Sequence, residues 1–224
     1  MIRHSNSVLK KAHELENSSD TVIRVGVSLM NPASILMDIW EKAAVGHQNI
    51  HLEVVPYEDS VPVFTEILNN LDNNIDVIAC LYENSYWGDK YRSFLLCNLP
   101  VCIACSKYHP LASKKLLTIN DLEGQNVIIR KRGLSQNIDQ IHNEFDAHPD
   151  IHRLETATLD YNTFNKLASS KDLILSYECW SNVHPLLTTI PVNWDYKSPY
   201  GLIYSKNPSD ELLKFILTIG NAAS

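Results

Sequence analysis

Glycine is scarce in this sequence, and no stretch is long and apolar enough to cross a membrane. With seven glycines in 224 residues, the chain has no glycine-rich phosphate loop, no dinucleotide fingerprint and no Gly-x-Ser-x-Gly nucleophile motif. No run approaches the ~18 continuous apolar residues of a membrane span, and the amino terminus lacks the apolar segment of a secretory signal. We therefore expect a cytoplasmic protein without membrane contact, with no catalytic residues and no cofactor.

Cysteine and positive charge are also limited. Five cysteines, an odd number, in a chain without a signal peptide indicate reduced thiols rather than a disulfide framework. Cys102 and Cys105 stand three apart in an expected strand, so their thiols point to opposite faces, and core packing is favoured over a metal site. The net charge of −7 argues against this chain holding duplex DNA by itself, because phosphate contacts require clustered Lys and Arg.

The first third of the chain alternates between strand and helix patterns. Strands are predicted at 22–28, 50–57 and 75–81, and helices at 35–43 and 63–71, each with an apolar stripe along one face. This alternation indicates parallel strands with right-handed crossovers. Ligands of such sheets bind beyond the carboxyl ends of the strands, so the loops after Ser28, Tyr57 and Leu81 are the first places to look for function.

A second alternating series follows an apolar run at 95–106, which predicts a crossover strand with a break or an edge at Pro100. Further strands are predicted at 126–130, 151–156 and 172–177, with helices at 137–145 and 161–168. A return crossover is expected at 200–205, before a last helix through 212–219. Two α/β lobes joined by two crossovers form a hinged clamshell, a shape that binds small molecules in its cleft.

The centre of the chain carries a more specific pattern. The segment Tyr108-His-Pro-Leu-Ala112, followed by Leu117-Thr-Ile-Asn-Asp-Leu-Glu-Gly-Gln-Asn-Val-Ile-Ile129, resembles a signature of the effector-binding domain of LysR-type transcriptional regulators. The strand at 23–27, the phrase at 74–79, the crossover after Leu95 and the final helix also match this family. The resemblance covers roughly residues 20–220.

This resemblance implies a two-lobe α/β fold of the type 2 periplasmic-binding-protein class. Each lobe would be a mixed, mostly parallel sheet flanked by helices, and two crossover hinge strands would join the lobes. Residues 1–19 are expected to form the end of a linker helix and a connector, residues 20–97 with 204–224 one lobe, and residues 98–203 the other. Such regulators bind DNA through a winged helix-turn-helix, which is absent from these residues.

The family also implies a partner. Its domains pair head-to-tail, with the first helix of one lobe beside the second-lobe helix of a neighbour. The implied homodimer or tetramer would bring Ile35, Ile39 and Ala43 against Ile138, Ile141 and Phe145.

The loop after the first strand supplies the first candidate binding residues. Its backbone N–H groups can face a carboxylate near the start of the next helix, and the family uses this position for effector contact. Asn31 or Ser34 could alternatively cap that helix. A second candidate is Ser60, which follows two acids, and for Asp59 we favour helix capping. The candidates of this lobe's first two loops are Ser28, Leu29, Met30, Asn31 and Ser60.

The other candidates follow later strands. Tyr82 can stack on a ligand or pack on the hinge. Arg130 and Arg132 suit an organic anion at the end of a strand, although a solvated charge run or a dimer contact is the alternative, and we favour that alternative for Lys131. Tyr177 is a candidate for the floor of the cleft.

We therefore predict a sensor that binds a small, anionic metabolite between two lobes and performs no chemistry. The alternative from another class is a solute-binding protein of a transport system with the same fold, against which the missing signal peptide argues. An enzyme on this fold would require a catalytic constellation in the cleft.

Overall fold

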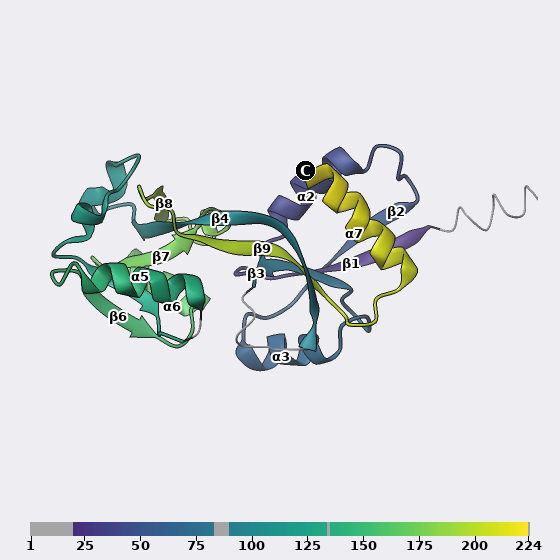
Figure 1. Cartoon of the computed structure of the whole chain (residues 1–224), viewed down its shortest axis with the longest axis horizontal. Coiled ribbons are helices and arrows are strands. Elements are labelled where there is room, and N and C mark those ends of the chain that lie inside the picture. Colours follow the sequence, from purple (N-terminus) through teal and green to yellow (C-terminus); the bar gives the residue numbers. More distant parts are fainter. Residues whose placement is uncertain (1–19, 83–89, 134, 224) are drawn as a thin grey trace, which may run out of the picture.

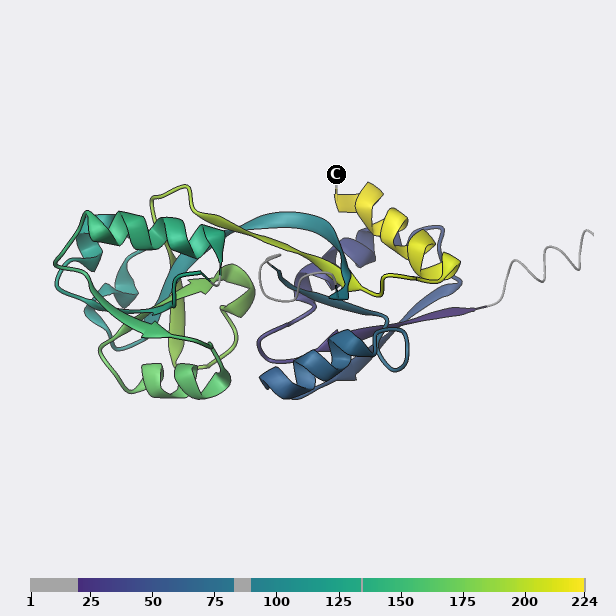
Figure 2. The same ribbon diagram turned by 60° about the horizontal axis from the view of Figure 1, so that its bottom comes forward.

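The computed structural model describes residues 20–82, 90–133 and 135–223 and arranges them in two α/β lobes (Figure 1). Residues 1–19, where the end of a linker helix is expected, lie outside the described residues. A nine-stranded sheet runs through both lobes in the order β2-β1-β3-β9-β4-β7-β5-β6, with β8 paired to β4. Figure 2 shows β4 and β9 passing side by side from one lobe to the other.

Lobe 1 is the strand-and-helix unit expected from the first third of the chain. Its elements are β1 (Thr21–Val27), α2 (Ser34–Ala43), β2 (Ile50–Pro56), α3 (Val61–Asn69), β3 (Val77–Leu81) and α7 (Asp210–Ala223). β1 pairs in parallel with β2 and β3. Alternate residues of a strand face opposite sides of the sheet, so Val77 packs in one core cluster with Leu36 of α2 and Phe215 of α7, whereas Ile78 packs with Leu68 of α3.

Lobe 2 repeats this arrangement. Its strands are β5 (Asn126–Arg130), β6 (His152–Thr156), β7 (Leu173–Tyr177) and β8 (Leu187–Pro191), its helices are α5 (Gln136–Asp146) and α6 (Tyr161–Ala168), and short 3-10 turns lie at η2 (Pro110–Ser113), η3 (Ile119–Leu122) and η4 (Glu178–Trp180). β5 pairs in parallel with β6 and β7. Ile129 packs with Ile141 of α5 on one face, and Ile128 packs with Phe164 of α6 on the other.

The two crossover strands are β4 (Arg92–Ser106) and β9 (Lys197–Tyr204). β4 does not break at Pro100, as its sequence suggested it could. Instead its partners change there, because the residues before Pro100 pair with β9 and those after it pair with β7 and β8. A Cβ at Gly201 would collide with the Phe94 carbonyl of β4, so a residue without a side chain is needed where the strands approach. The expected lobe boundaries at 97 and 204 fall within β4 and at the last residue of β9.

The structure corrects three sequence-based expectations. The strand β8 was not predicted, and β9 begins at Lys197 rather than at residue 200. The third correction concerns the subunit interface. Ile138, Ile141 and Phe145 are at most 4% exposed within the core of lobe 2, so these side chains cannot contact a partner, and any partner of α5 must contact its outer face. The apolar stripe of this helix was correctly found, but it serves its own lobe.

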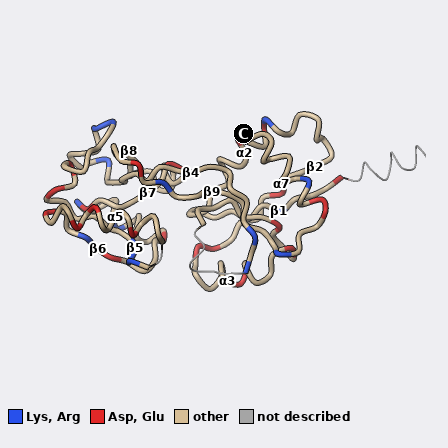
Figure 3. Tube along the Cα trace, viewed as in Figure 1, with Lys and Arg blue, Asp and Glu red and all other residues tan. Residues whose placement is uncertain are grey.

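Acidic and basic residues are interspersed over both lobes rather than gathered into one basic face (Figure 3). Within the described ranges, no helix is both long and apolar enough to cross a membrane.

Candidate functional site

The loop between β1 and α2 lies at the junction of the lobes. Ser28 and Asn31 close it into a turn, because the Ser28 N–H donates to the Asn31 carbonyl (3.3 Å) and the Asn31 N–H donates to Ser28 Oγ (3.1 Å). Leu29, at the tip, is 49% exposed. The Met30 side chain is buried in a lobe 2 cluster that includes Phe164 and Ile174. The turn therefore inserts one apolar side chain of lobe 1 into the α6 face of lobe 2.

Polar contacts secure this insertion. The Trp180 indole N–H, just beyond β7, donates to the Met30 carbonyl at 2.7 Å. The Trp180 ring stands edge-on to Tyr177 and to Phe164, with centroids 5.1 Å and 5.9 Å away. The Tyr200 hydroxyl of β9 donates to the Pro32 carbonyl at 3.0 Å. Lobe 2 and a crossover strand thus both hold the carbonyls of the β1–α2 loop.

The amide side of the same loop is bonded within lobe 1. The Met30 N–H donates to Asp59 Oδ2 at 3.1 Å. Asp59 therefore does not cap α3, as we had favoured; Ser60 occupies the N-cap, and its Oγ accepts the Val63 N–H at 3.4 Å. One of the loop donors that we expected to face a ligand carboxylate, the Met30 N–H, is bonded instead to a carboxylate of the protein.

A buried hydroxyl lies under this loop. Tyr57, the residue after β2, places its Oη against the side chains of Ser28 and Asn31, yet its geometry forms no hydrogen bond among the described residues. Burial raises the pKa of Tyr57 far above its ordinary value, Ser28 and Asn31 oppose this effect, and the negative charge of Asp59 adds to it. Tyr57 is consequently a neutral hydroxyl donor.

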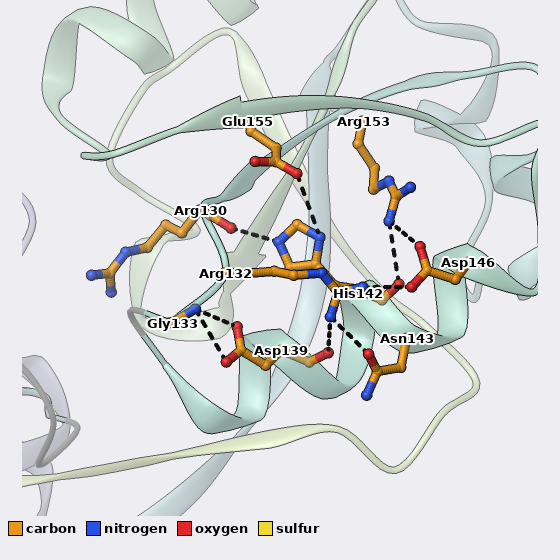
Figure 4. A network of polar contacts seen from close by, with 9 residues as sticks. All are labelled: Arg130, Arg132, Gly133, Asp139, His142, Asn143, Asp146, Arg153 and Glu155. Atoms are coloured by element: carbon orange, nitrogen blue, oxygen red, sulfur yellow. Dashed lines mark hydrogen bonds and ion pairs between the residues drawn. The ribbon is translucent and has the colours of Figure 1, made fainter.

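Arg130, at the end of β5, places a cation on the lobe 2 side of the junction. It follows Ile128 by two residues, so both side chains lie on the α6 face of β5, where Met30 enters. Its carbonyl accepts the His142 Nε2–H at 2.8 Å, which holds the end of the strand. Within the described ranges its guanidinium has no hydrogen bond or ion pair, and Figure 4 shows it directed away from the neighbouring polar network. Arg130 is thus free to receive an anion.

Ser176 of β7 adds a hydroxyl on the same face. The parallel register pairs Ile128 with Ile174, so two residues further Ser176 is level with Arg130. Ser176 is fully buried, and its Oγ has no hydrogen-bond partner among the described residues. A buried hydroxyl left unpaired costs roughly 1–3 kcal/mol, which a ligand or a water molecule can recover.

Three other sequence candidates lie apart from this site. Arg132 donates to Asp146, Asn143 and the Asp139 carbonyl on the outside of α5 (Figure 4). Tyr82 is tied to the crossover, where its N–H donates to the Pro199 carbonyl at 3.1 Å; burial raises the pKa of Tyr82, and Ser93 opposes this. Tyr177 hydrogen-bonds Ser198 of β9 at 2.9 Å, and only its ring edge meets the site, through Trp180.

The residues that sequence analysis missed are Tyr57, Asp59 as a loop anchor, Ser176 and Trp180. Trp180 follows a strand by three residues, so the rule that directed attention to strand ends in lobe 1 could have found it in lobe 2. Ser176 carries no such signal, since only the β5–β7 register places it beside Arg130.

The cysteines have a structural role. Cys102 and Cys105 are buried in the core, as predicted, and burial raises the pKa of each thiol to about 11. No group of three or more His, Cys, Asp or Glu suited to a metal occurs in the part of the chain that the structure describes.

A separate hollow of about 540 Å³ opens beside the end of β4 in lobe 2, next to Tyr108 and Lys171. Its polar groups are partly paired within the protein: Ser106 Oγ donates to the Ala168 carbonyl at 3.0 Å, and His109 Nδ1 accepts the Leu111 N–H at 3.1 Å. The inter-lobe junction offers unpaired groups and is the better candidate.

Comparison with known proteins supports one architecture. The sequence matches no family model and no curated protein. Among solved structures, the BenM effector-binding domain with its effector benzoate shares 19% identity at a TM-score of 0.56, covering 91% of this chain and 92% of that one. The QuiR effector-binding domain in complex with shikimate shares 15% identity at a TM-score of 0.60, covering 92% and 96%. CbnR, a LysR family transcriptional regulator, shares 12% identity at a TM-score of 0.66, covering 100% and 77%.

At these identities the likeness establishes the fold. The chain has the two-lobe α/β fold of the effector-binding domains of LysR-type regulators, and the predicted fold class is confirmed.

Proposed function

We propose that this chain is the effector-binding domain of a LysR-type transcriptional regulator that acts in the cytoplasm. A small molecule with an anionic group would bind between the lobes. The observation that carries this proposal is the arrangement at the junction, where Met30 of lobe 1 packs on the face of β5 that also carries Arg130, whose guanidinium is free among the described residues. Solved domains of the same fold, with benzoate or shikimate bound, support it.

The proposed signal is a change in the angle between the lobes. A ligand shifts such an equilibrium only by its difference in affinity for the two arrangements. The contacts that differ between a closed and an opened junction are the Trp180–Met30 hydrogen bond and the burial of the Met30 side chain. A ligand that stabilises or displaces them changes how the regulator presents its winged helix-turn-helix to DNA.

We further propose a homodimer as the working unit. The half-buried Ile35 and Ile39 remain on the lobe 1 side of the predicted pairing. On the lobe 2 side, the outer residues of α5, such as Gln136 and Gln140, replace the buried stripe. Light scattering after size exclusion tests this pairing, and a monomer at every concentration would refute it.

These observations favour ligand binding by a sensor over catalysis and over delivery of a solute to a transporter. Among the described residues, the junction groups without a hydrogen-bond partner are the Arg130 guanidinium and the hydroxyls of Tyr57 and Ser176. Neither hydroxyl therefore has a base bonded to it, and the Asp59 carboxylate is already hydrogen-bonded. The similar solved structures are regulatory domains.

A thermal-shift screen of the whole chain against small carboxylates tests the function. A ligand at 100 times its dissociation constant stabilises a protein by about 2.7 kcal/mol. We expect a shift that Arg130→Gln abolishes and that Lys131→Gln, the same charge change at an exposed neighbour, leaves in place. Equal responses of both variants would place the site elsewhere, and consumption of the ligand would indicate an enzyme.

A further inference from the structure

Three backbone donors near the tip of the β1–α2 loop are already engaged. The Ser28 N–H is bonded to the Asn31 carbonyl, the Asn31 N–H to Ser28 Oγ, and the Met30 N–H to Asp59 Oδ2. At Met30 the loop therefore presents a carboxylate, that of Asp59, while the first turn of α2 has no side-chain cap.

The segments of the two lobes at the junction carry opposite charges. In lobe 1 the loops at 28–33 and 57–60 contain two acids, Glu58 and Asp59, and no Lys or Arg. In lobe 2 the segment after β5 begins with Arg130 and Lys131. Of the acids of lobe 2 near the junction, Asp160 accepts the Thr163 N–H as the N-cap of α6, and Glu178 is exposed beyond β7, near the thiols of Cys102 and Cys179.

Asp59 and Arg130 are connected to Met30 from opposite lobes. Asp59 holds the amide of Met30, whose side chain packs on Phe164 and Ile174. Ile128, two residues before Arg130 on the same strand face, packs against that same cluster. Met30 is thus bonded to a carboxylate of lobe 1 and packs on the strand face of lobe 2 that carries Arg130.

We propose that the ligand is a small zwitterion, an amino acid or a related amino carboxylic acid, whose ammonium group binds Asp59 and whose carboxylate binds Arg130. An ionised carboxyl group offers about four lone-pair sites, so Asp59 can hold the Met30 N–H through Oδ2 and still accept an ammonium through Oδ1. A simple carboxylate has no cation to offer Asp59 and would add a second negative charge at this loop. This inference rests on the proposed function and specifies the ligand class of the same site.

The test compares matched ligands on the whole chain by thermal shift and calorimetry. The panel contains the standard amino acids with β-alanine and γ-aminobutyrate, and each hit is measured beside its deaminated and decarboxylated analogues. L-leucine, 4-methylpentanoate and 3-methylbutylamine form one such set. We expect the amino acid to bind at least about tenfold more tightly than either analogue, the factor that one lost charge-assisted hydrogen bond produces.

Two variants test whether Asp59 causes the preference for an amino acid over its deaminated analogue. Asp59→Asn keeps an oxygen that can accept the Met30 N–H but removes the charge, so affinity for the amino acid should fall about tenfold or more while affinity for its deaminated analogue rises. Glu58→Gln, the matched control, removes an exposed neighbouring charge and should change neither. If Asp59→Asn weakens both ligands equally, Asp59 only positions the loop and the proposal is wrong.

The outcomes also separate this inference from the proposed function. If simple carboxylates bind as tightly as the amino acids, or bind while no amino compound does, the zwitterion is excluded and the sensor stands. If neither class binds, both proposals fall.

Discussion

The two lobes share a plan but meet each other with different chemistry. Both end their parallel strands at the junction, yet lobe 1 presents a closed turn whose amide is bonded to Asp59, while lobe 2 presents an unpaired guanidinium and an indole donor. Each lobe keeps one buried hydroxyl without a partner among the described residues, Tyr57 in lobe 1 and Ser176 in lobe 2, and lobe 2 adds the unpaired cation. A ligand between the lobes pairs with that cation and competes with the contacts that lobe 2 makes to Met30.

The largest effect on this difference between the lobes is expected from removing the Met30 side chain, which passes from lobe 1 into lobe 2. Met30→Ala empties a buried position in the lobe 2 cluster, and large-to-small changes of this kind cost about 2–5 kcal/mol. We expect about 2 kcal/mol by urea unfolding, because lobe 2 can partly close over the gap. Leu29→Ala, at the exposed tip, is the control and should lie within about 0.5 kcal/mol of wild type. Equal effects would mean that the turn is not inserted.

The next prediction concerns the close contact between the crossover strands β4 and β9. Gly201→Ala places a Cβ against the Phe94 carbonyl, where neither crossover strand can withdraw without losing ladder bonds. Overpacking of this kind costs about 1–3 kcal/mol, and we expect a loss in this range in chemical denaturation. Unchanged stability would show that β4 and β9 are not held as closely as the structure places them.

The hydrogen bond from Trp180 to the Met30 carbonyl is tested by replacing two tryptophans, one at the junction and one away from it. Trp180→Phe keeps an aromatic ring but removes the donor to the Met30 carbonyl, a loss of about 1 kcal/mol. Trp194→Phe removes an equal 2.7 Å bond to the Val101 carbonyl, away from the lobe 1 loop. Both variants should lose similar stability, but only Trp180→Phe should increase the radius of gyration in solution scattering. An increase in both would contradict a specific role for Trp180.

The smallest predicted effect is a difference in how the helix caps of the two lobes contribute to stability as the pH changes. The helices α3 and α6 are capped by Ser60 and Asp160. Hydrogen bonds from the Thr163 hydroxyl and backbone lower the pKa of Asp160 below its ordinary value. A carboxyl group with a lowered pKa in the folded state stabilises the protein above the unfolded pKa of about 3.9. That contribution disappears as the pH falls through the folded value.

The cap variants should therefore respond differently to acid. Asp160→Asn should lose a few tenths of a kcal/mol at pH 7 and become less sensitive to acid, while Ser60→Ala should lose about 1 kcal/mol at every pH. Urea midpoints measured at pH 7 and at pH 3.5 check both. A Ser60→Ala loss that itself varies with pH would refute the assignment of the caps.

Much of the fold was predictable, because hydrophobic periodicity reports directly on local structure. The helix stripes around Leu36 and Ile141 and the strands 126–130 and 173–177 follow from which residues are apolar. At α5 periodicity located the apolar stripe, but the family resemblance assigned it to a partner, although it packs on Ile129 of its own lobe. Periodicity shows which face of a helix is buried and not what covers it.

The sequence by itself determined the alternation of strands and helices, and with it the loops in which binding residues lie. Only the tertiary structure decided what those residues do. Arg130 and Arg132 are indistinguishable in sequence, yet Arg130 is the last residue of β5 and has a free guanidinium among the described residues, whereas Arg132 lies beyond the strand and is bonded to α5 on the surface. Asp59 and Met30 are 29 residues apart, and Trp180 and Met30 are 150 apart. Contacts at such separations form only when the sheet brings strand ends together, so local sequence carries no record of them.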